Sequence, residues 1–280
     1  MVDELREKHK LDDLLSASGL VKSVYYYHRN TLNTPNPDET IKALIKNVFH
    51  QHKSRYGYRR ITSTLRSSGV VINHKKVQRL MSELGLKSKV RPKRYRSYKG
   101  EVGKIAPNLL QRDFNADKPN QKWVTDVTEF KVGEEKVYLS PILDLYNQEV
   151  VSYEVRNSVK LPLVTDMLKM AMTKLKWHEK PIFHSDQGWQ YQNSTVQSLL
   201  KTKGLKQSMS RKGNCLDNAV AENFFGLLKT EMYHGEQFTS AAHLIESIKD
   251  YIEYYNYKRI KLKLKGLSPI DYRNQALLTA

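Results

Sequence analysis

The order of the sequence patterns after about residue 120 restricts the fold more than any other feature of this 280-residue chain. Residues 123–130, 136–145 and 150–155 are rich in β-branched and aromatic residues and are separated by turns, which predicts three antiparallel strands. Helical and strand patterns then alternate, and this order predicts an α/β fold in which helices flank a mixed sheet. The later segments are a helix at 163–175, a strand at 181–186, a helix at 194–203, a strand at 205–209, and helices at about 217–231 and 241–257.

The charge of the chain points to a polyanionic partner. The net charge is +18, and residues 1–110 carry 23 Lys plus Arg against 9 Asp plus Glu, whereas residues 111–280 carry 24 against 20. Clustered basic residues gain affinity for DNA because they displace counterions from its phosphates. An anionic membrane surface would also attract this charge, but no basic amphipathic helix with a strong apolar face accompanies it. Nucleic acid is therefore the favoured partner, bound mainly by the N-terminal part.

The sequence shows no membrane span, secretion signal or disulfide framework. No window approaches the roughly 18 apolar residues of a membrane span, and the first ten residues are too charged for a signal peptide. Cys215 has no second cysteine with which to pair. These features predict a cytoplasmic protein without membrane association.

Residues 1–50 predict a first helix-turn-helix region. Two helices around a tight turn at Gly19 are expected between residues 11 and 29. Asp38 is placed to cap a third helix, at about 40–52. Short helix pairs also occur in proteins that never touch DNA, so this pattern alone does not establish DNA binding.

Residues 51–86 predict a second helix-turn-helix-like module, followed by a basic linker at 87–118. In the module, a helix at 58–67 and a helix capped by Asn73 each have one apolar face, and basic side chains lie off those faces. The linker mixes cations with tyrosines and has no hydrophobic period, which is typical of an arm along the DNA backbone or of a solvated tether. DNA contact is predicted for Arg59, Arg60, Lys75, Lys76, Arg79, Arg91, Lys93, Arg94 and Arg96, with a plain solvated surface as the alternative.

Three acidic residues stand out by their placement. Asp126 lies within the first predicted strand, Asp186 ends the fourth, and Glu222 lies in a later helix after a polar loop. Strand ends and helix starts meet at one edge of a sheet, so these carboxylates can converge there. A two-metal site for a hard divalent cation needs such a set of oxygen ligands. For Asp126, a salt bridge to one of the many basic residues is an equally good interpretation.

The predicted helix around Glu222 carries two distinct faces. Glu222 and Lys229 lie on one face with Gly226 between them, which suits a metal ligand with a phosphate contact beside it. An ordinary surface helix would account for Lys229 as well. The neighbouring face is predicted to be buried and consists of Ala221, Phe224, Phe225 and Leu228.

Four further polar residues have simpler interpretations. His184 stands two residues before Asp186 and would point to the same face of a strand, where it either supports the site or is a packed histidine. Asp217 is predicted to be a helix N-cap. Glu129 and Asp144 are predicted to be paired surface charges.

The three acidic residues stand in motifs that resemble the retroviral-integrase-like catalytic core of the IS3 family of bacterial insertion-sequence transposases. Thirty-five residues separate Asp186 from Glu222, which is the spacing of that family's Asp-Asp-Glu triad, and Lys229 matches its basic residue seven positions later. The motifs are Trp123-Val-Thr-Asp126-Val-Thr, His184-Ser-Asp186-Gln-Gly and Asn218-Ala-Val-Ala-Glu222-Asn-Phe-Phe-Gly-Leu-Leu-Lys229.

The resemblance extends over essentially the whole chain. Arg55-Tyr-Gly-Tyr-Arg-Arg60 is similar to the family's upstream helix-turn-helix insert, and residues 255–273 are similar to its C-terminal signature. The resemblance implies an RNase H-like catalytic core at 119–235, completed by a C-terminal helix and tail at 236–280.

The resemblance also implies a DNA transposase in which Asp126, Asp186 and Glu222 bind two Mg²⁺ or Mn²⁺ ions and Lys229 contacts DNA. In the implied mechanism, one ion helps to activate the water that releases a 3′-hydroxyl at the transposon end. That hydroxyl then attacks the target DNA while the second ion stabilises the leaving oxygen. Family membership further implies a homo-oligomer on two DNA ends, a fusion to an upstream reading-frame protein, and a place at the bacterial nucleoid.

Two interpretations compete with a transposase. One is a basic DNA-binding regulator that catalyses nothing, which predicts that residues 1–110 retain DNA and that the chain never cuts it. The other is a nuclease that cuts DNA without joining ends, which predicts metal-dependent nicking without strand transfer.

Overall fold

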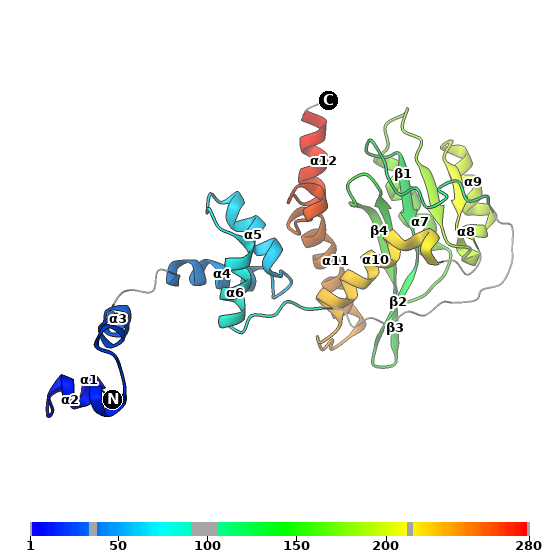
Figure 1. Cartoon of the computed structure of the whole chain (residues 1–280). Helices are drawn as coiled ribbons and strands as arrows, with labels where there is room; N and C mark the ends of the chain where they lie inside the picture. The colour runs from blue at the N-terminus through cyan, green and yellow to red at the C-terminus, as the bar shows by residue number, and fades with distance from the viewer. Residues whose placement is uncertain (1, 34–37, 91–105, 212–214, 279–280) are drawn as a thin grey trace.

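The structure is centred on one mixed sheet of six strands (Figure 1). The computed structural model describes residues 2–33, 38–90, 106–211 and 215–278. The strands are β1 (Lys122–Thr125), β2 (Thr128–Val132), β3 (Glu135–Asp144), β4 (Val150–Arg156), β5 (Ile182–Ser185) and β6 (Lys206–Met209). β3 pairs with β4 on one side and with β1 and β2 on the other, and β5 and β6 extend the sheet beyond β1. Because β3 is antiparallel to its neighbours, all other strands run in one direction, and the three predicted antiparallel strands are confirmed.

Helices cover both faces of this sheet, so the predicted α/β architecture is confirmed. The helices are α7 (Pro162–Thr173), α8 (Trp189–Gln192), α9 (Ser194–Thr202), α10 (Ala219–Leu228), a π-helix (Lys229–Tyr233), α11 (Ala241–Tyr257) and α12 (Pro269–Leu278), with 3-10 turns at Cys215–Asn218 and Leu262–Leu264. The side chains of successive residues in β1 point to opposite faces of the sheet. Trp123 packs with α7 and α9, and Val124 packs with α10 and α11. Both side chains are fully buried, as expected for a central strand.

Residues 106–118 belong to the core rather than to a free linker. Leu110 is buried in the core beside α10 and α11. The backbone N–H of Leu109 donates to Ser208 Oγ at 2.8 Å, and Met209 N–H donates to Pro107 O at 3.3 Å. The predicted linker at 87–118 therefore ends earlier than expected, because its last residues pair along β6.

Three helices upstream of the core form a unit of their own. They are α4 (Glu39–Gln51), α5 (Tyr58–Ser67) and α6 (His74–Glu83), and their apolar side chains share one core that includes Ile45, Ile61 and Val77. The predicted domain boundary at residue 50 falls inside this core, because α4 packs on α5 and α6. The predicted cap at Asn73 is confirmed, since its side chain accepts from Lys75 N–H at 2.9 Å.

Asp38 is the N-cap residue of α4, as predicted, but its side chain makes no capping hydrogen bond. Its carboxylate instead lies 2.6 Å from Lys76 Nζ and 2.7 Å from an Arg79 nitrogen. Two cations from α6 therefore hold the first turn of α4, and they outcompete the backbone N–H groups for this carboxylate.

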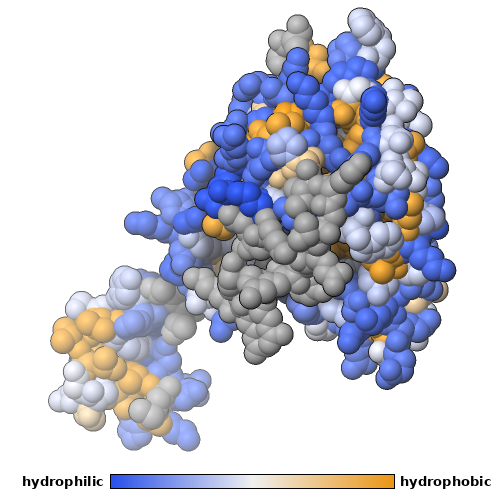
Figure 2. Space-filling model, turned by 90° about the vertical axis from the view of Figure 1, so that its right-hand side faces the viewer, coloured by the Kyte–Doolittle hydropathy of each residue, from blue (hydrophilic) through white to orange (hydrophobic). Residues whose placement is uncertain are grey.

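The N-terminal helices form a small separate group. They are α1 (Val2–Leu5), α2 (Leu11–Ser18) and α3 (Lys22–Asn33), and Gly19 ends α2 in the left-handed region with φ 67°. The two helices predicted around Gly19 are confirmed. Hydrophobic side chains gather on this group at the lower left of Figure 2, while the rest of that face is mostly hydrophilic. The exposed apolar residues there include Leu20, Val21 and Val24.

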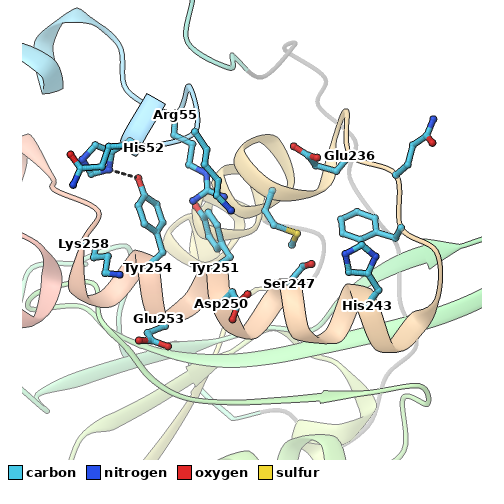
Figure 3. A pocket seen from close by; sticks show the side chains of 15 residues that line it. His52, Arg55, Glu236, His243, Ser247, Asp250, Tyr251, Glu253, Tyr254 and Lys258 are labelled. Carbon is cyan, nitrogen blue, oxygen red and sulfur yellow. Dashed lines mark hydrogen bonds between the residues drawn. The ribbon is translucent and has the colours of Figure 1, made fainter. Parts of the chain in front are cut away.

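The three-helix unit contacts the core beside α11. Residues of both parts line a cavity of about 830 Å³ there (Figure 3). On its rim the His52 ring lies 3.2 Å by Nδ1 from Tyr254 Oη, and the Arg55 guanidinium lies over the Tyr254 ring at 4.5 Å. Tyr56 Oη donates to Lys258 O at 3.1 Å. These contacts join residues about 200 positions apart.

Within the part of the chain that the structure describes, no helix is long and apolar enough to cross a membrane.

Candidate active site

Strand register brings Asp126 and Asp186 side by side. β1 and β5 are parallel neighbours in which Val124 pairs with His184. When this register is continued by two residues, Asp126 lies opposite Asp186, directly after the two strands end. Side chains at matching positions of parallel strands point to the same face, so both carboxylates lie on the side where Val124 packs against α10.

The surroundings of these two carboxylates disfavour their ionised forms. Asp126 Oδ1 accepts from Val127 N–H at 2.7 Å, and Asp186 Oδ1 accepts from Gly188 N–H at 2.9 Å. Burial raises the pKa of Asp126 well above its ordinary value, and the charge of Asp186 raises it further. Burial also raises the pKa of Asp186 against the opposing hydrogen bond from Gly188. A divalent cation would relieve such crowding of negative charge.

The loop after Asp186 leaves little room around its carboxylate. A Cβ atom at Gly188 would lie 2.9 Å from Asp186 Oδ1, so a side chain at this position would displace the carboxylate. Tyr191 is buried below the pair, with its hydroxyl 3.3 Å from Thr125 Oγ1. Burial raises the pKa of the Tyr191 phenol well above its usual value, and the charge of Asp126 adds to this shift, so the phenol stays neutral.

Glu222 lies in the first turn of α10, on its exposed side. Its charge helps to raise the pKa of Asp126, and the charge of Lys229 lowers that pKa, so both side chains lie within electrostatic reach of Asp126. Lys229 Nζ also lies 5.0 Å from the centre of the Phe130 ring. The predicted buried face of this helix is confirmed, and it consists of Ala221, Phe224, Phe225 and Leu228.

Asp217 fixes the segment that leads into α10. Arg211 donates to its fully buried carboxylate from the backbone N–H, Nε and one terminal nitrogen, at 2.9 to 3.0 Å. Arg112 Nε and Asn108 Nδ2 donate to it at 3.0 and 3.1 Å. Hydrogen bonding from Arg211 is the main reason why the pKa of Asp217 lies well below its usual value. The predicted N-cap role is wrong, because Asn218 is the N-cap of α10 and the Asp217 carboxylate binds arginines.

His184 and Asn218 tie the same segment to the strands of the site. His184 is fully buried, with Nδ1 2.8 Å from Ser208 Oγ and Nε2 2.9 Å from the Asp217 carbonyl. Burial lowers the pKa of His184, which favours a neutral ring that donates through Nε2. Asn218 Nδ2 donates to the Thr125 carbonyl at 3.1 Å. These contacts make His184 a packed histidine that bonds the segment before Glu222, and its support of the site through that segment stays a prediction.

The donor set suits a hard divalent cation, because all three predicted ligands offer carboxylate oxygens. Asp126 and Asp186 meet, whereas Glu222 stands farther away on the surface of α10. In keeping with this, no group of three His, Cys, Asp or Glu residues lies close enough to hold an ion as the described residues stand. The structure therefore brings together two of the three predicted ligands and keeps the third on an adjacent helix.

The basic residues predicted to contact DNA divide by their surroundings. Lys76 and Arg79 pair with Asp38, and Arg79 also pairs with Glu83. One Arg60 nitrogen lies 3.8 Å from a carboxylate oxygen of Glu231 in the core. Arg59 and Lys75 are exposed on the three-helix unit, and Arg91, Lys93, Arg94 and Arg96 lie outside the described residues. DNA contact remains a prediction for all of them.

A second buried ionic cluster, which no sequence pattern predicted, lies between the core and the three-helix unit. Glu231 accepts two hydrogen bonds from Arg259, at 2.6 and 2.8 Å, and one from Tyr251 Oη at 3.0 Å. Arg55 Nε donates to the Glu231 carbonyl at 3.2 Å. The available signal was the arginine-rich motif at residues 55–60, which reads equally well as a DNA-binding surface.

Comparison with known proteins shows that the chain is similar to integrase core domains and to insertion-sequence transposases. Residues 116–215 and 222–277 each match a family described as integrase core domain, and residues 36–94 match an HTH-like domain. Transposase InsK of insertion sequence element IS150 from Escherichia coli is 52% identical over 99% of this chain and 98% of its own. Transposase InsF of insertion sequence IS3A from the same species is 36% identical over 84% of this chain and 82% of its own. The solved HTLV-2 integrase catalytic core in complex with magnesium is 16% identical and covers 56% of this chain and 99% of its own, with a TM-score of 0.43.

Proposed function

Because the chain belongs to the IS3 family of insertion-sequence transposases, we propose that Asp126, Asp186 and Glu222 hold two Mg²⁺ or Mn²⁺ ions and with them cut and join DNA at transposon ends. A transposase with an integrase core transfers polynucleotide strands, which is the activity of the family. The observation that supports these ligands is the crowding of Asp126 and Asp186 at one sheet edge, with both pKa values raised.

The side chains around the site have separable tasks in this proposal. Asp126 and Asp186 form a rigid pair of ligands. Glu222 completes the ligand set from α10 when its exposed side chain changes conformation. Bound ions would activate the attacking hydroxyl and neutralise the leaving oxygen. Lys229 contacts a phosphate beside Glu222. Tyr191 remains a neutral phenol next to the carboxylates and so adds no negative charge to the site.

The experiment is to incubate the chain with Mg²⁺ and labelled DNA that carries the ends of its own element. We expect 3′-end nicks and joined products from the wild type. Asp186→Asn and Glu222→Gln should each lower both reactions by roughly 100-fold or more, because charge stabilisation in the transition state is lost. DNA retention in a gel-shift assay should stay nearly unchanged for both variants.

Glu246→Gln is the matched control, since this carboxylate is exposed on α11 and pairs there with Lys249. It should cut and join DNA like the wild type. Full activity of Glu222→Gln would remove Glu222 from the ligand set. Nicks without joined products would favour a nuclease, and DNA retention by residues 1–110 without any nicks would favour a regulator.

The proposed partners are the transposon ends and the target DNA, bound by a homo-oligomer. The net charge of +18 supports DNA as the partner. We further propose that the chain acts as a fusion with an upstream reading-frame protein at the nucleoid. Comparing the activity of the chain alone with that of the fused protein tests this dependence.

A further inference from the structure

A shallow cavity lies at the same edge of the sheet as the acidic pair. Its volume is about 720 Å³, and Trp189, Tyr138, Leu161 and Pro162 line it together with Lys136 and Lys160. β4 runs in the same direction as β1 and β5, so the segment that follows β4 lies at the edge where Asp126 and Asp186 stand. Trp189 follows Asp186 by three residues and begins α8 (Figure 1).

Trp189 exposes a large apolar surface three residues after Asp186. Its side chain is 54% exposed, whereas Trp123 is fully buried. Exposed indole rings in DNA-acting proteins offer a flat surface on which a base can stack. The other exposed tryptophan, Trp177, lies between α7 and β5 and therefore at the opposite edge of the sheet.

The position of Trp189 relative to Asp186 is fixed by the backbone. Gly188 N–H donates to the Asp186 carboxylate at 2.9 Å, and Tyr191 N–H donates to the Gly188 carbonyl at 3.1 Å. Gln192 Nε2 donates to the Gln187 carbonyl at 2.5 Å. A group stacked on the indole is thus held at a set distance from the carboxylates.

The side chains that line the cavity indicate which kind of ligand it binds. The lining combines apolar and aromatic side chains with two ammonium groups, of which Lys160 is exposed and Lys136 pairs with Glu129 at 3.1 Å. An unstacked nucleobase brings a flat apolar face and a phosphate together, which matches an indole with a lysine beside it. A purely apolar ligand would gain nothing from these cations.

We propose that the cavity at Trp189 receives an unpaired nucleobase of the DNA next to the phosphodiester bond that the site cuts. This inference rests on the proposed function for the location of that bond. It assigns Trp189 a binding role that a paired, uninterrupted duplex would not engage, because the base must leave the stack to reach the indole.

The test is a binding measurement without metal, on DNA that carries 2-aminopurine at an unpaired position beside the cut site. Trp189→Ala should weaken binding of this DNA roughly 10- to 100-fold and leave binding of a fully paired duplex unchanged. Trp189→Phe should retain part of the affinity, because a smaller ring still stacks. Trp177→Ala is the matched control, and it should bind both DNAs like the wild type. Thermal unfolding of each variant verifies that it is folded.

Each result decides the inference. A change in 2-aminopurine fluorescence that depends on Trp189 and is restricted to unpaired DNA supports it. Equal affinity of Trp189→Ala and wild type for the unpaired DNA overturns it, as does a lower oligomer mass of Trp189→Ala without DNA, which would indicate a protein contact. Wild-type cleavage with Mg²⁺ is measured in parallel, for the chain alone and for the fused protein. Trp189-dependent binding without cleavage by either protein contradicts the proposed function and leaves the base site standing.

Discussion

At the scale of single residues, burial and partners decide which carboxylates of this chain resist ionisation. Asp144 is fully buried and accepts backbone hydrogen bonds from Asn120 at 2.7 Å and from Tyr146 at 3.0 Å. Burial nevertheless raises its pKa to about 6. Asp38 shows the opposite behaviour, because hydrogen bonding from Lys76 lowers its pKa. A buried carboxylate without a cation is costly wherever it stands, whether or not it is catalytic.

Asp144 should make stability depend on pH. Its folded pKa of about 6 lies above the unfolded value of 3.8, so the folded state holds the proton more tightly in this window. The free energy of unfolding should therefore fall as pH rises from about 4 to 6, by about 3 kcal/mol from this residue. Asp144→Asn removes this contribution. Urea denaturation at pH 4, 5, 6 and 7 should therefore show that the free energy of unfolding of the variant, relative to that of the wild type, rises by this amount as pH increases. Parallel curves for the two proteins would contradict the prediction.

The sequence allowed the placement of an acidic residue to be predicted only where strand geometry determines it. Asp126 and Asp186 were identifiable because strand ends share an edge, and their common register follows from strand pairing. The predictions for Asp217 as a cap and for Asp144 as a paired surface charge were wrong. The partners of Asp217 include Arg112, more than 100 residues away, and no local pattern announces such a contact. Glu129 does pair with Lys136 at the surface, as predicted.

At the scale of elements, α10 is held in place from its N-terminal side. Asp217 accepts hydrogen bonds from Arg112 and Arg211, and the side chain of Asn218, the N-cap of α10, donates to the Thr125 carbonyl in β1. The helix itself follows from its apolar spacing, as does α11, whose predicted bounds of 241–257 match the structure. The four-residue α8 and the π-helix were not predicted, because they are too short for a periodic pattern.

Asp217 should position Glu222 without touching the DNA. Asp217→Asn removes the charge that holds two arginines, so the segment before α10 should loosen. We expect faster amide hydrogen exchange at residues 215–222 in the metal-free protein and cleavage lowered roughly 10- to 100-fold, as for other supporting residues of metal sites.

Glu149→Gln serves as the control for Asp217→Asn, because Glu149 is also a nearly buried carboxylate and pairs with Arg273 at 2.7 Å, near the C-terminus. It should lower stability without faster exchange at residues 215–222. Similar exchange in both variants would show that Asp217 contributes only to overall stability.

At the scale of the whole molecule, Glu231 links the catalytic core to the three-helix unit. Its carboxylate binds Arg259 and Tyr251 of the core, and its carbonyl accepts from Arg55 of the unit. Both Glu231 and Arg259 are almost fully buried. The sequence predicted the two parts but not their junction, because the junction is built from single residues spread between positions 52 and 259.

Glu231→Gln should weaken the entire molecule, because it leaves the Arg259 guanidinium buried without a counter-charge. The free energy of unfolding should fall by roughly 3–5 kcal/mol, as measured by urea denaturation. Glu246→Gln breaks an exposed pair with Lys249 and should have a much smaller effect, because water and salt screen the charges of such a pair. Equal effects of the two changes would mean that the buried cluster contributes no more than a surface pair.

The shared register of Asp126 and Asp186 makes the site sensitive to chain length as well as to residue identity. Deleting a single residue within β1 would turn the Asp126 carboxylate to the other face of the sheet, where Trp123 and Tyr191 pack. A change of length in the turn at residues 133–134 leaves that pairing intact. Insertions and deletions among natural variants should therefore collect in the turns and avoid β1 and β5, even where substitutions in those strands are tolerated.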